Sequence, residues 1–245
     1  MSHTSVGLFA TCLVDLIRPN VGFATIKLLE QVGCQVDVPL KQTCCGQPAY
    51  NNGDLQTSCQ IAQQVITLFE DYDYIVAPSG SCLGMLKHHY PALFTENDGD
   101  WKIKAERFSA KCYELTSFLT EVKPIVIKAS FPHSVTYHDS CSSQRELNIK
   151  QQPRELLSQV AGLELREMEE TEVCCGFGGT FSVKYPDIST RMVSNKANNI
   201  QNTEAEYLVT ADMGCLMNIA GRLHRLDSPV KAFHIAEILA NMAEE

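Results

Sequence analysis

Apolar side chains follow two different periods along this chain of 245 residues. In residues 19–33 they recur every three or four positions, with a proline at the start and a glycine at the end, which predicts an amphipathic helix. The segments YIVAP (74–78) and YLVTA (207–211) are instead short, continuously apolar and rich in β-branched and aromatic residues, as strands covered on both faces are. Because helical and strand segments alternate, we expect parallel sheets flanked by helices.

The chain contains an internal repeat, in which the same order of segments occurs twice. Each copy has a strand-like segment that ends near a cysteine, a helical segment, a second apolar segment, a CCG triplet, another helical segment and a final strand followed by a cysteine. The triplets are residues 44–46 and 174–176. An internal repeat of this kind predicts an α/β fold of two tandem pseudo-symmetric repeats, each a small parallel sheet flanked by helices with cysteines at the carboxyl ends of strands. We assign residues 1–122 to the first domain and 123–245 to the second.

Eight of the eleven cysteines form two matching sets. In each set, 31 or 32 residues separate a first cysteine from an adjacent pair, and 36 or 39 residues separate the pair from a last cysteine. The adjacent pairs do not suit disulfides, because neighbouring Cα atoms lie about 3.8 Å apart, closer than the roughly 4.4–6.8 Å that a disulfide prefers. The first quartet is Cys12, Cys44, Cys45 and Cys82, and the second quartet is Cys141, Cys174, Cys175 and Cys215.

The chemistry of the two quartets indicates a metal site in each half. The single cysteines follow predicted strands, and open α/β sheets bind ligands at the carboxyl ends of their strands. Four thiolates suit an iron–sulfur cluster or a tetrahedral structural zinc, and the spacing does not separate these two. Cys34, Cys59 and Cys112 have no counterpart in the other half, and we interpret them as core thiols.

Four glycines and a histidine accompany the cysteines. A glycine beside a paired cysteine lets the backbone approach closely and point its N–H groups at sulfur. His138 stands next to Asp139, shortly before Cys141, where the two side chains could tune a cluster, move a proton or cap the turn. The glycines that we expect to contact the cofactor are Gly46, Gly176, Gly178 and Gly179.

The charge of the chain argues against several partners. With 20 Lys and Arg against 29 Asp and Glu, the formal net charge of -9 is unfavourable for binding nucleic acid or an anionic membrane surface. The first residues carry no basic segment, and Thr11, Cys12 and Asp15 interrupt their apolar stretch, so we expect a cytoplasmic protein that is not an integral membrane protein. The stretch GFGG (176–179) lacks the Lys-Ser/Thr pair of a phosphate-binding loop and is not the dinucleotide fingerprint.

Several longer strings resemble a known family. They are TCCGQPAYNNG (43–53), APSGSC (77–82), YHDSC (137–141), CCGFGGTFSVKYPDIS (174–189) and DMGCLMNIAGRL (212–223). The chain resembles the cysteine-rich CCG-domain proteins over nearly its whole length. That superfamily also holds the B subunit of heterodisulfide reductase and the iron–sulfur subunit of glycolate oxidase, and the longer strings are similar to its lactate-utilisation group.

The resemblance implies an oxidoreductase subunit with two CCG domains. Its eight quartet cysteines would be the ligands of iron–sulfur clusters, at least one of them 4Fe–4S, which we expect in the second half. The family works with a ferredoxin-like iron–sulfur subunit and a third small subunit in the oxidation of L-lactate to pyruvate. We therefore expect the isolated chain to be inactive.

The chain departs from its relatives at three positions. Heterodisulfide reductase domains end in C-x-x-C, but the last position here is Met85 or Asn218, which leaves four cysteine ligands in each half. Many relatives read HDSCH where this chain has Ser142. The chain also lacks the C-x2-C-x2-C-x3-C-P run of ferredoxins and any credible flavin or nicotinamide motif, so a redox subunit fits better than a complete dehydrogenase.

Two other interpretations stay open at the level of sequence. The chain could be a binding module stabilised by zinc in one or both halves. It could also be a thiol/disulfide oxidoreductase similar to heterodisulfide reductase, in which the paired cysteines cycle without a permanent metal.

Overall fold

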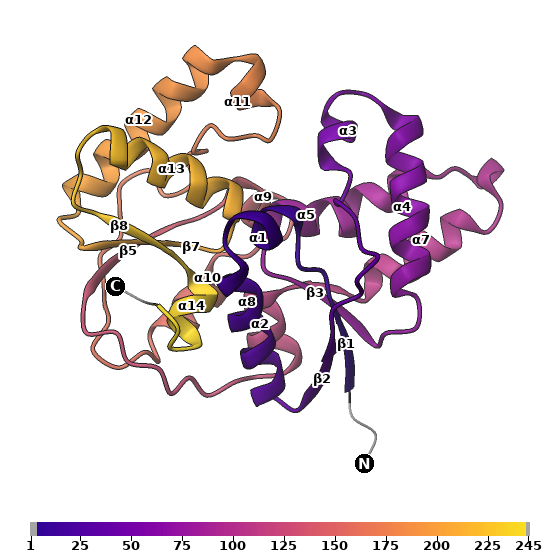
Figure 1. The fold of residues 1–245 in the computed structure, drawn as a ribbon, viewed down its shortest axis with the longest axis horizontal. Coiled ribbons are helices and arrows are strands. Elements are labelled where there is room, and N and C mark those ends of the chain that lie inside the picture. The colour runs from indigo at the N-terminus through magenta and orange to yellow at the C-terminus, as the bar shows by residue number, and fades with distance from the viewer. Residues whose placement is uncertain (1–3, 244–245) are drawn as a thin grey trace. The chain divides into compact units, whose positions relative to one another are not determined.

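The computed structural model describes residues 4–243 and divides into two compact units, Met1–Pro124 and Ile125–Glu245 (Figure 1). Each unit contains one four-stranded sheet in which every strand pair is parallel. Within the described range, none of the helices has the length and apolar character needed to cross a membrane.

The first unit has the strand order β2–β1–β3–β4. Val6 at the centre of the sheet pairs with Val36 on one side and with Tyr74 on the other. The strands are β1 (Thr4–Leu8), β2 (Cys34–Asp37), β3 (Tyr74–Ala77) and β4 (Cys112–Glu114). The helices are α1 (Cys12–Ile17), α2 (Pro19–Gln31), α3 (Gln47–Asn51), α4 (Leu55–Phe69), α5 (Gly80–Gly84), η1 (Met85–His89), α6 (Tyr90–Leu93), η2 (Glu96–Asp98), α7 (Trp101–Ala110), α8 (Leu115–Ser117) and η3 (Phe118–Val122).

Helix α2 follows from the period of its sequence. Its apolar stripe of Val21, Ala24 and Leu28 is fully buried. Pro19 takes the first helical position, where no intrahelical N–H bond is lost, and Gly33 just past the end has φ +78°, the left-handed conformation that glycine adopts easily. The predicted helix over residues 19–33 is therefore present, and it ends two residues earlier, at Gln31.

The second unit repeats this plan with the strand order β6–β5–β7–β8. Figure 1 shows α12 and α13 on one side of its sheet, with α10 and α14 on the other. The strands are β5 (Ser134–His138), β6 (Glu164–Leu165), β7 (Tyr207–Thr210) and β8 (Lys231–His234). The helices are α9 (Cys141–Arg145), α10 (Gln151–Leu157), α11 (Phe181–Lys184), α12 (Pro186–Asn202), α13 (Met213–Arg225) and α14 (Ile235–Leu239).

In each sheet, the direction in which the chain moves from strand to strand reverses between the two central strands. From β1 the chain crosses to β2 on one side and then returns past β1 to β3 on the other. Helices connecting in opposite directions leave a crevice at the carboxyl ends of the two central strands, which is where open α/β sheets bind ligands. In the second unit, β5 and β7 flank the corresponding point.

The predicted fold class is confirmed: two tandem α/β repeats with small parallel sheets flanked by helices. Strands β4 and β8 were not assigned from the sequence. The apolar segment that follows α10 yields only the two-residue strand β6 at the edge of its sheet. The extra residues of the first repeat form the additional helices between β3 and β4, where the second repeat has only α13 between β7 and β8.

Candidate metal centres

The single cysteines of each quartet lie at the central crevice of their own sheet. Cys12 begins α1 four residues after β1 ends, and Cys82 lies in α5, which follows β3. In the second unit, Cys141 begins α9 after β5 and Cys215 lies in the first turn of α13 after β7. Because these strands are neighbours, the fold brings two cysteines distant in sequence to the same edge.

The first quartet is held together by contacts between its thiols. Cys44 forms side-chain hydrogen bonds with Cys12 and Cys45, and Cys45 forms one with Cys82. The bond with Cys12, the bond with Cys45 and a third from the Gly46 backbone lower the pKa of Cys44 to about 2. The same bond, followed by burial, raises the pKa of Cys12. One sulfur of the quartet is thus a thiolate that its neighbours stabilise.

The second quartet repeats this arrangement. Cys174 forms side-chain hydrogen bonds with Cys141 and Cys175, which together lower its pKa to about 2. The Cys175 sulfur lies 3.3 Å from the Cys215 sulfur. Cys175 and Cys215 are buried and pack in the same apolar cluster of the unit. The structure therefore brings together all four members of each quartet.

The glycine of each CCG triplet is required by the backbone. Gly46 has φ +83° and Gly176 has φ +85°, conformations that residues with a side chain rarely adopt. The N–H of Gly176 donates to the Cys174 sulfur at 3.3 Å. A Cβ atom at Gly176 would lie 2.9 Å from the backbone oxygen of Ser189 and 2.9 Å from the Cβ of Met192. The triplet thus turns the chain so that an N–H group points at the first sulfur.

The other two expected glycines shape the next turn. Gly178 has φ +51° and Gly179 has φ +59°. Their carbonyl oxygens accept hydrogen bonds from the Phe181 N–H at 3.1 Å and the Ser182 hydroxyl at 3.2 Å, so both residues lead the chain into α11. The backbone bond to the Cys175 sulfur comes instead from Phe177, which the sequence did not single out.

The carbonyl of the second paired cysteine is also fixed in both units. Asn218 donates from its amide nitrogen to the Cys175 oxygen at 2.9 Å, and the Tyr90 hydroxyl donates to the Cys45 oxygen at 3.0 Å. Asn218 stands three residues after Cys215, in the first half of α13. Its side chain therefore positions the pair, a function that no local pattern of the sequence revealed.

His138 lies in the second site. It is the last residue of β5, its side chain is fully buried, and burial followed by the charge of Lys196 lowers its pKa to about 3. One of its ring nitrogens and the sulfurs of Cys175 and Cys215 lie within 4.8 Å of one another.

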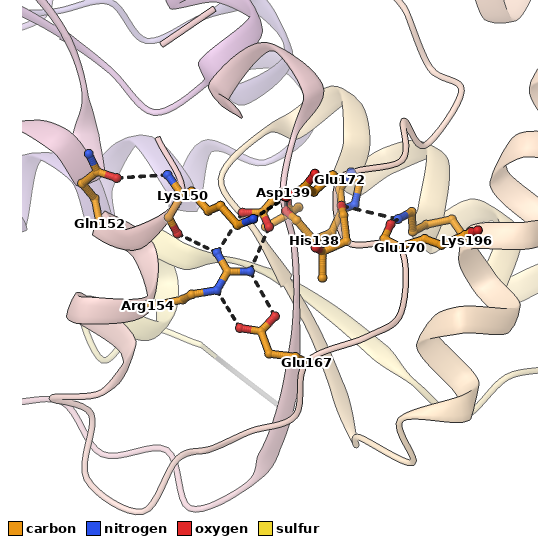
Figure 2. Close-up of polar contacts among 11 residues, drawn as sticks. His138, Asp139, Lys150, Gln152, Arg154, Glu167, Glu170, Glu172 and Lys196 are labelled. Carbon is orange, nitrogen blue, oxygen red and sulfur yellow. Dashed lines mark hydrogen bonds and ion pairs between the residues drawn. The ribbon is translucent and has the colours of Figure 1, made fainter. Parts of the chain in front are cut away.

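Asp139 anchors the loop that leads from β5 to Cys141. Arg154 of α10 donates to both of its carboxylate oxygens, at 3.0 and 2.8 Å, and donates also to Glu167 at 2.6 and 3.0 Å. The Arg154 guanidinium lies 5.4 Å from the centre of the Tyr137 ring. Figure 2 shows Arg154 between the two carboxylates. Asp139 is thus a structural partner of Arg154, which the sequence left undecided.

Lys196 brings a positive charge into the interior of the second unit. The residue is 1% exposed, and its ammonium group donates to the backbone oxygen of Glu170 (Figure 2). It also donates to the backbone oxygen of Thr171. Burial lowers the pKa of Lys196. A buried cation beside the quartet favours anions there.

Exposed apolar side chains line a cavity at the first quartet and follow the CCGFGG loop of the second. A cavity of about 370 Å³ reaches Cys12 and Cys44 and is lined in part by Leu16 and Leu40, which are 75% and 100% exposed. In the second unit, Val183 and Tyr185 are exposed in the segment that follows the CCGFGG loop. Exposed apolar surface near a site is typical of contacts with other proteins.

The three remaining cysteines lie outside both quartets. The Cys112 thiol donates to the Phe108 oxygen at 3.3 Å and the Cys59 thiol donates to the Leu93 oxygen at 3.6 Å. Cys34 and Cys112 are buried, whereas Cys59 is half-buried. All eleven cysteines are free thiols.

The donor set fits a group that prefers sulfur ligands. Each unit offers four thiols at one edge, one of them a thiolate that already receives an N–H bond. Iron–sulfur clusters and structural zinc both bind four thiolates, and hydrogen bonds to the sulfurs are part of how such groups are held. The fold and these sites define a tandem α/β protein with one cysteine-rich site in each repeat.

Comparisons with known proteins agree with this class. The cysteine-rich CCG domain matches residues 6–87 and 135–220. The chain is 50% identical to lactate utilization protein A of Geobacillus thermodenitrificans over 235 residues, 96% of this chain and 98% of that protein. It is 49% identical to lactate utilization protein A of Oceanobacillus iheyensis, covering 96% of each. The chain belongs to the family of cysteine-rich CCG-domain proteins that includes these lactate utilization A proteins.

A solved structure shares the fold at low sequence identity. A hypothetical protein from Helicobacter pylori superposes with a TM-score of 0.70 and 11% identity, covering 100% of this chain and 50% of that one. At this identity the likeness concerns the fold alone.

Proposed function

We propose that this chain is an iron–sulfur subunit of a cytoplasmic system that oxidises L-lactate to pyruvate. The observation that carries the proposal is the gathering of two cysteine quartets, one in each repeat, in a chain about half identical to proteins named for lactate utilization. The repeats correspond to two CCG domains, residues 1–122 and 123–245.

The eight quartet cysteines would hold the clusters. A bound iron–sulfur cluster supplies one-electron transfer at a potential set by its ligands and surroundings. The chain supplies two thiolates, Cys44 and Cys174, whose low pKa favours metal binding at neutral pH. It also supplies N–H groups from the CCG glycines, and it buries Cys45, Cys175 and Cys215 away from solvent.

Oxidation of lactate to pyruvate removes two electrons and two protons, which require an acceptor. Because the sequence carries no flavin or nicotinamide motif and no ferredoxin run, we assign the entry or exit of electrons to partner proteins. The ferredoxin-like subunit and the third small subunit expected from the family are the proposed partners. The exposed apolar side chains at the cavity beside the first quartet support such contacts.

A thiol/disulfide oxidoreductase is the second candidate. The 3.3 Å contact between Cys175 and Cys215, beside a thiolate at Cys174, resembles a thiol poised for exchange. This function would require activity from a metal-free chain. A zinc-stabilised module would instead bind zinc without sulfide.

Reconstitution with the partner subunits tests the proposed function. The isolated chain should neither oxidise L-lactate nor reduce a dye with it, and activity should appear when the ferredoxin-like subunit and the third subunit are added under anaerobic conditions. Deleting the gene should abolish growth on L-lactate and spare growth on pyruvate. Normal growth on lactate in a host without another lactate dehydrogenase would contradict the assignment, as would lactate oxidation by the isolated chain.

A further inference from the structure

His138 is a buried polar side chain at the carboxyl end of β5. Neither ring nitrogen has a hydrogen-bond partner among the described residues, although the side chain is fully buried. An unpaired polar group in the interior is destabilising, and native structures normally satisfy it with protein, water or an ion. The imidazole therefore requires a partner that the described chain does not supply.

The fold itself does not need a polar residue here. In the first unit the matching residue, three positions before the first quartet cysteine, is Phe9, and it is also fully buried. A phenyl ring thus fills this place at one quartet without leaving any atom unpaired. His138 adds two nitrogen atoms at the other quartet, and its polarity is specific to that site.

The nearest candidates for a shared partner are two buried sulfurs. A ring nitrogen of His138 and the sulfurs of Cys175 and Cys215 lie within 4.8 Å of one another. In the part of the chain that the structure describes, this is the only group of three His, Cys, Asp or Glu side chains with such compact ligand atoms. Their spacing suits a metal ion bound by all three.

The neighbouring charged groups are engaged elsewhere. Asp139 is bound by Arg154, and the Lys196 ammonium group donates to the backbone oxygens of Glu170 and Thr171. Neither group occupies a ring nitrogen of His138, and a neutral imidazole has one nitrogen with the lone pair that a metal needs.

We propose that His138 is a nitrogen ligand of the metal group held by the second quartet. The two sites then differ in their donors: thiolates alone in the first unit, and thiolates with one imidazole in the second. A cluster has several irons and can accept a fifth ligand, whereas a single tetrahedral ion would take the imidazole with three thiolates. The inference rests on the proposed function only in requiring a metal at the second quartet.

The test detects the nitrogen directly and uses the full chain. Cys44→Ser with Cys45→Ser removes the first site, so that any signal comes from the second. The chain is produced with ordinary or ¹⁵N-labelled histidine, loaded with iron and sulfide anaerobically, reduced, and studied by pulsed electron paramagnetic resonance. A parallel sample of the metal-free chain is loaded with Co²⁺, and its paramagnetically shifted imidazole signals are recorded by nuclear magnetic resonance.

The expected result is a directly coordinated nitrogen that responds to the ¹⁵N label. It should disappear in His138→Phe, the residue that the first unit carries, and persist in the control His133→Asn, because His133 is partly exposed and interacts with Glu206. Metal content, measured on every sample, should remain in His138→Phe because the thiolates are intact.

Each remaining outcome decides the inference separately from the proposed function. Bound iron and sulfide without histidine coupling in the unsubstituted His138 chain would overturn the ligand assignment and leave the iron–sulfur proposal standing. Co²⁺ binding with the histidine signal but no uptake of iron and sulfide would support the ligand and contradict the cluster. A chain that binds neither would contradict both.

Discussion

At the scale of single residues, each CCG triplet lowers the pKa of its first cysteine. The first cysteine becomes a thiolate because two thiols and one backbone N–H donate to it, and the glycine takes the left-handed conformation that aims that N–H. The two units achieve this with the same residues in the same order. The paired cysteines are therefore unequal in protonation before any metal binds.

This inequality predicts the pH dependence of alkylation in the metal-free, reduced chain. Because the pKa of Cys44 and Cys174 is lowered to about 2, both are already thiolates at pH 6, and their rates should stay flat from pH 6 to 9. Burial raises the pKa of Cys59, so its rate should rise about tenfold with each pH unit in this range. Peptide mapping by mass spectrometry after timed alkylation measures the rates. Parallel pH profiles at Cys174 and Cys59 would refute the assignment.

Lys196 marks a second difference between the units. The buried faces of α4 and α12 match at five positions with identical spacing, and the residue that matches Lys196 is Val65. The second unit therefore has a buried positive charge where the first has an apolar side chain. Burying this cation costs desolvation free energy. That charge stabilises the thiolates and any anionic group they hold.

Replacing this cation should weaken metal binding at the second site alone. With the first site removed by Cys44→Ser and Cys45→Ser, Lys196→Met should lower the affinity for Co²⁺ by about tenfold or more in a chelator competition, since one nearby charge contributes at least about 1.4 kcal/mol. Lys196→Arg, which keeps the charge, is the matched control and should lose less. Equal affinities in the wild type and in Lys196→Met would show that the charge does not act on the site.

At the scale of elements, helix α10 holds the strand end that carries the second site. Arg154 of α10 forms an ion pair with Asp139, which follows His138 at the end of β5. The Asp139 side chain is 1% exposed. Removing one partner of a buried pair leaves the other charge without compensation. The position of Cys141 therefore depends on a contact made by a different element.

Arg154→Met should lower the free energy of unfolding by about 3 kcal/mol, as expected for breaking a buried pair. The matched control is Arg166→Met, because Arg166 pairs with Glu164 at the surface, and its loss should cost less than about 1 kcal/mol. Chemical denaturation of the metal-free chain, followed by circular dichroism, measures both. Similar losses in the two variants would show that the Asp139 pair does not anchor the loop.

The sequence predicted the elements whose signal is local. Helix α2 and strands β3 and β7 lie where the apolar periodicity predicted them, with Pro19 and Gly33 marking the ends of the helix. Strand β4 has three residues and ends at Glu114, and β8 has four residues and begins at Lys231, so their pairing with β3 and β7 depends on the rest of the sheet.

The same limit applies to the sites. Repeat spacing was enough to group the eight cysteines that the structure brings together. Asn218, Tyr90 and Arg154 act through contacts that span 43, 45 and 15 residues, and one sequence gives no signal for such pairs.

At the scale of the whole molecule, two units with the same strand order carry sites of different polarity. The first has Phe9 and Val65 where the second has His138 and Lys196. A duplicated domain with identical thiol positions but different surroundings can hold two groups of different potential, because charge and burial tune such groups. The shared plan places the two cysteine quartets, and the differing residues give each quartet different surroundings.

The most direct test of the central claim is metal and sulfide analysis of the anaerobically purified chain. We predict iron with equimolar acid-labile sulfide, about four of each per cluster. In the chain whose first site is removed by Cys44→Ser and Cys45→Ser, both should be lost when Cys141, Cys174, Cys175 or Cys215 is replaced by alanine. Alanine at Cys34, Cys59 or Cys112 should leave the iron content unchanged, because these thiols lie outside the quartets. Zinc without sulfide, or iron that survives loss of the quartets and depends on the other three cysteines, would contradict the account.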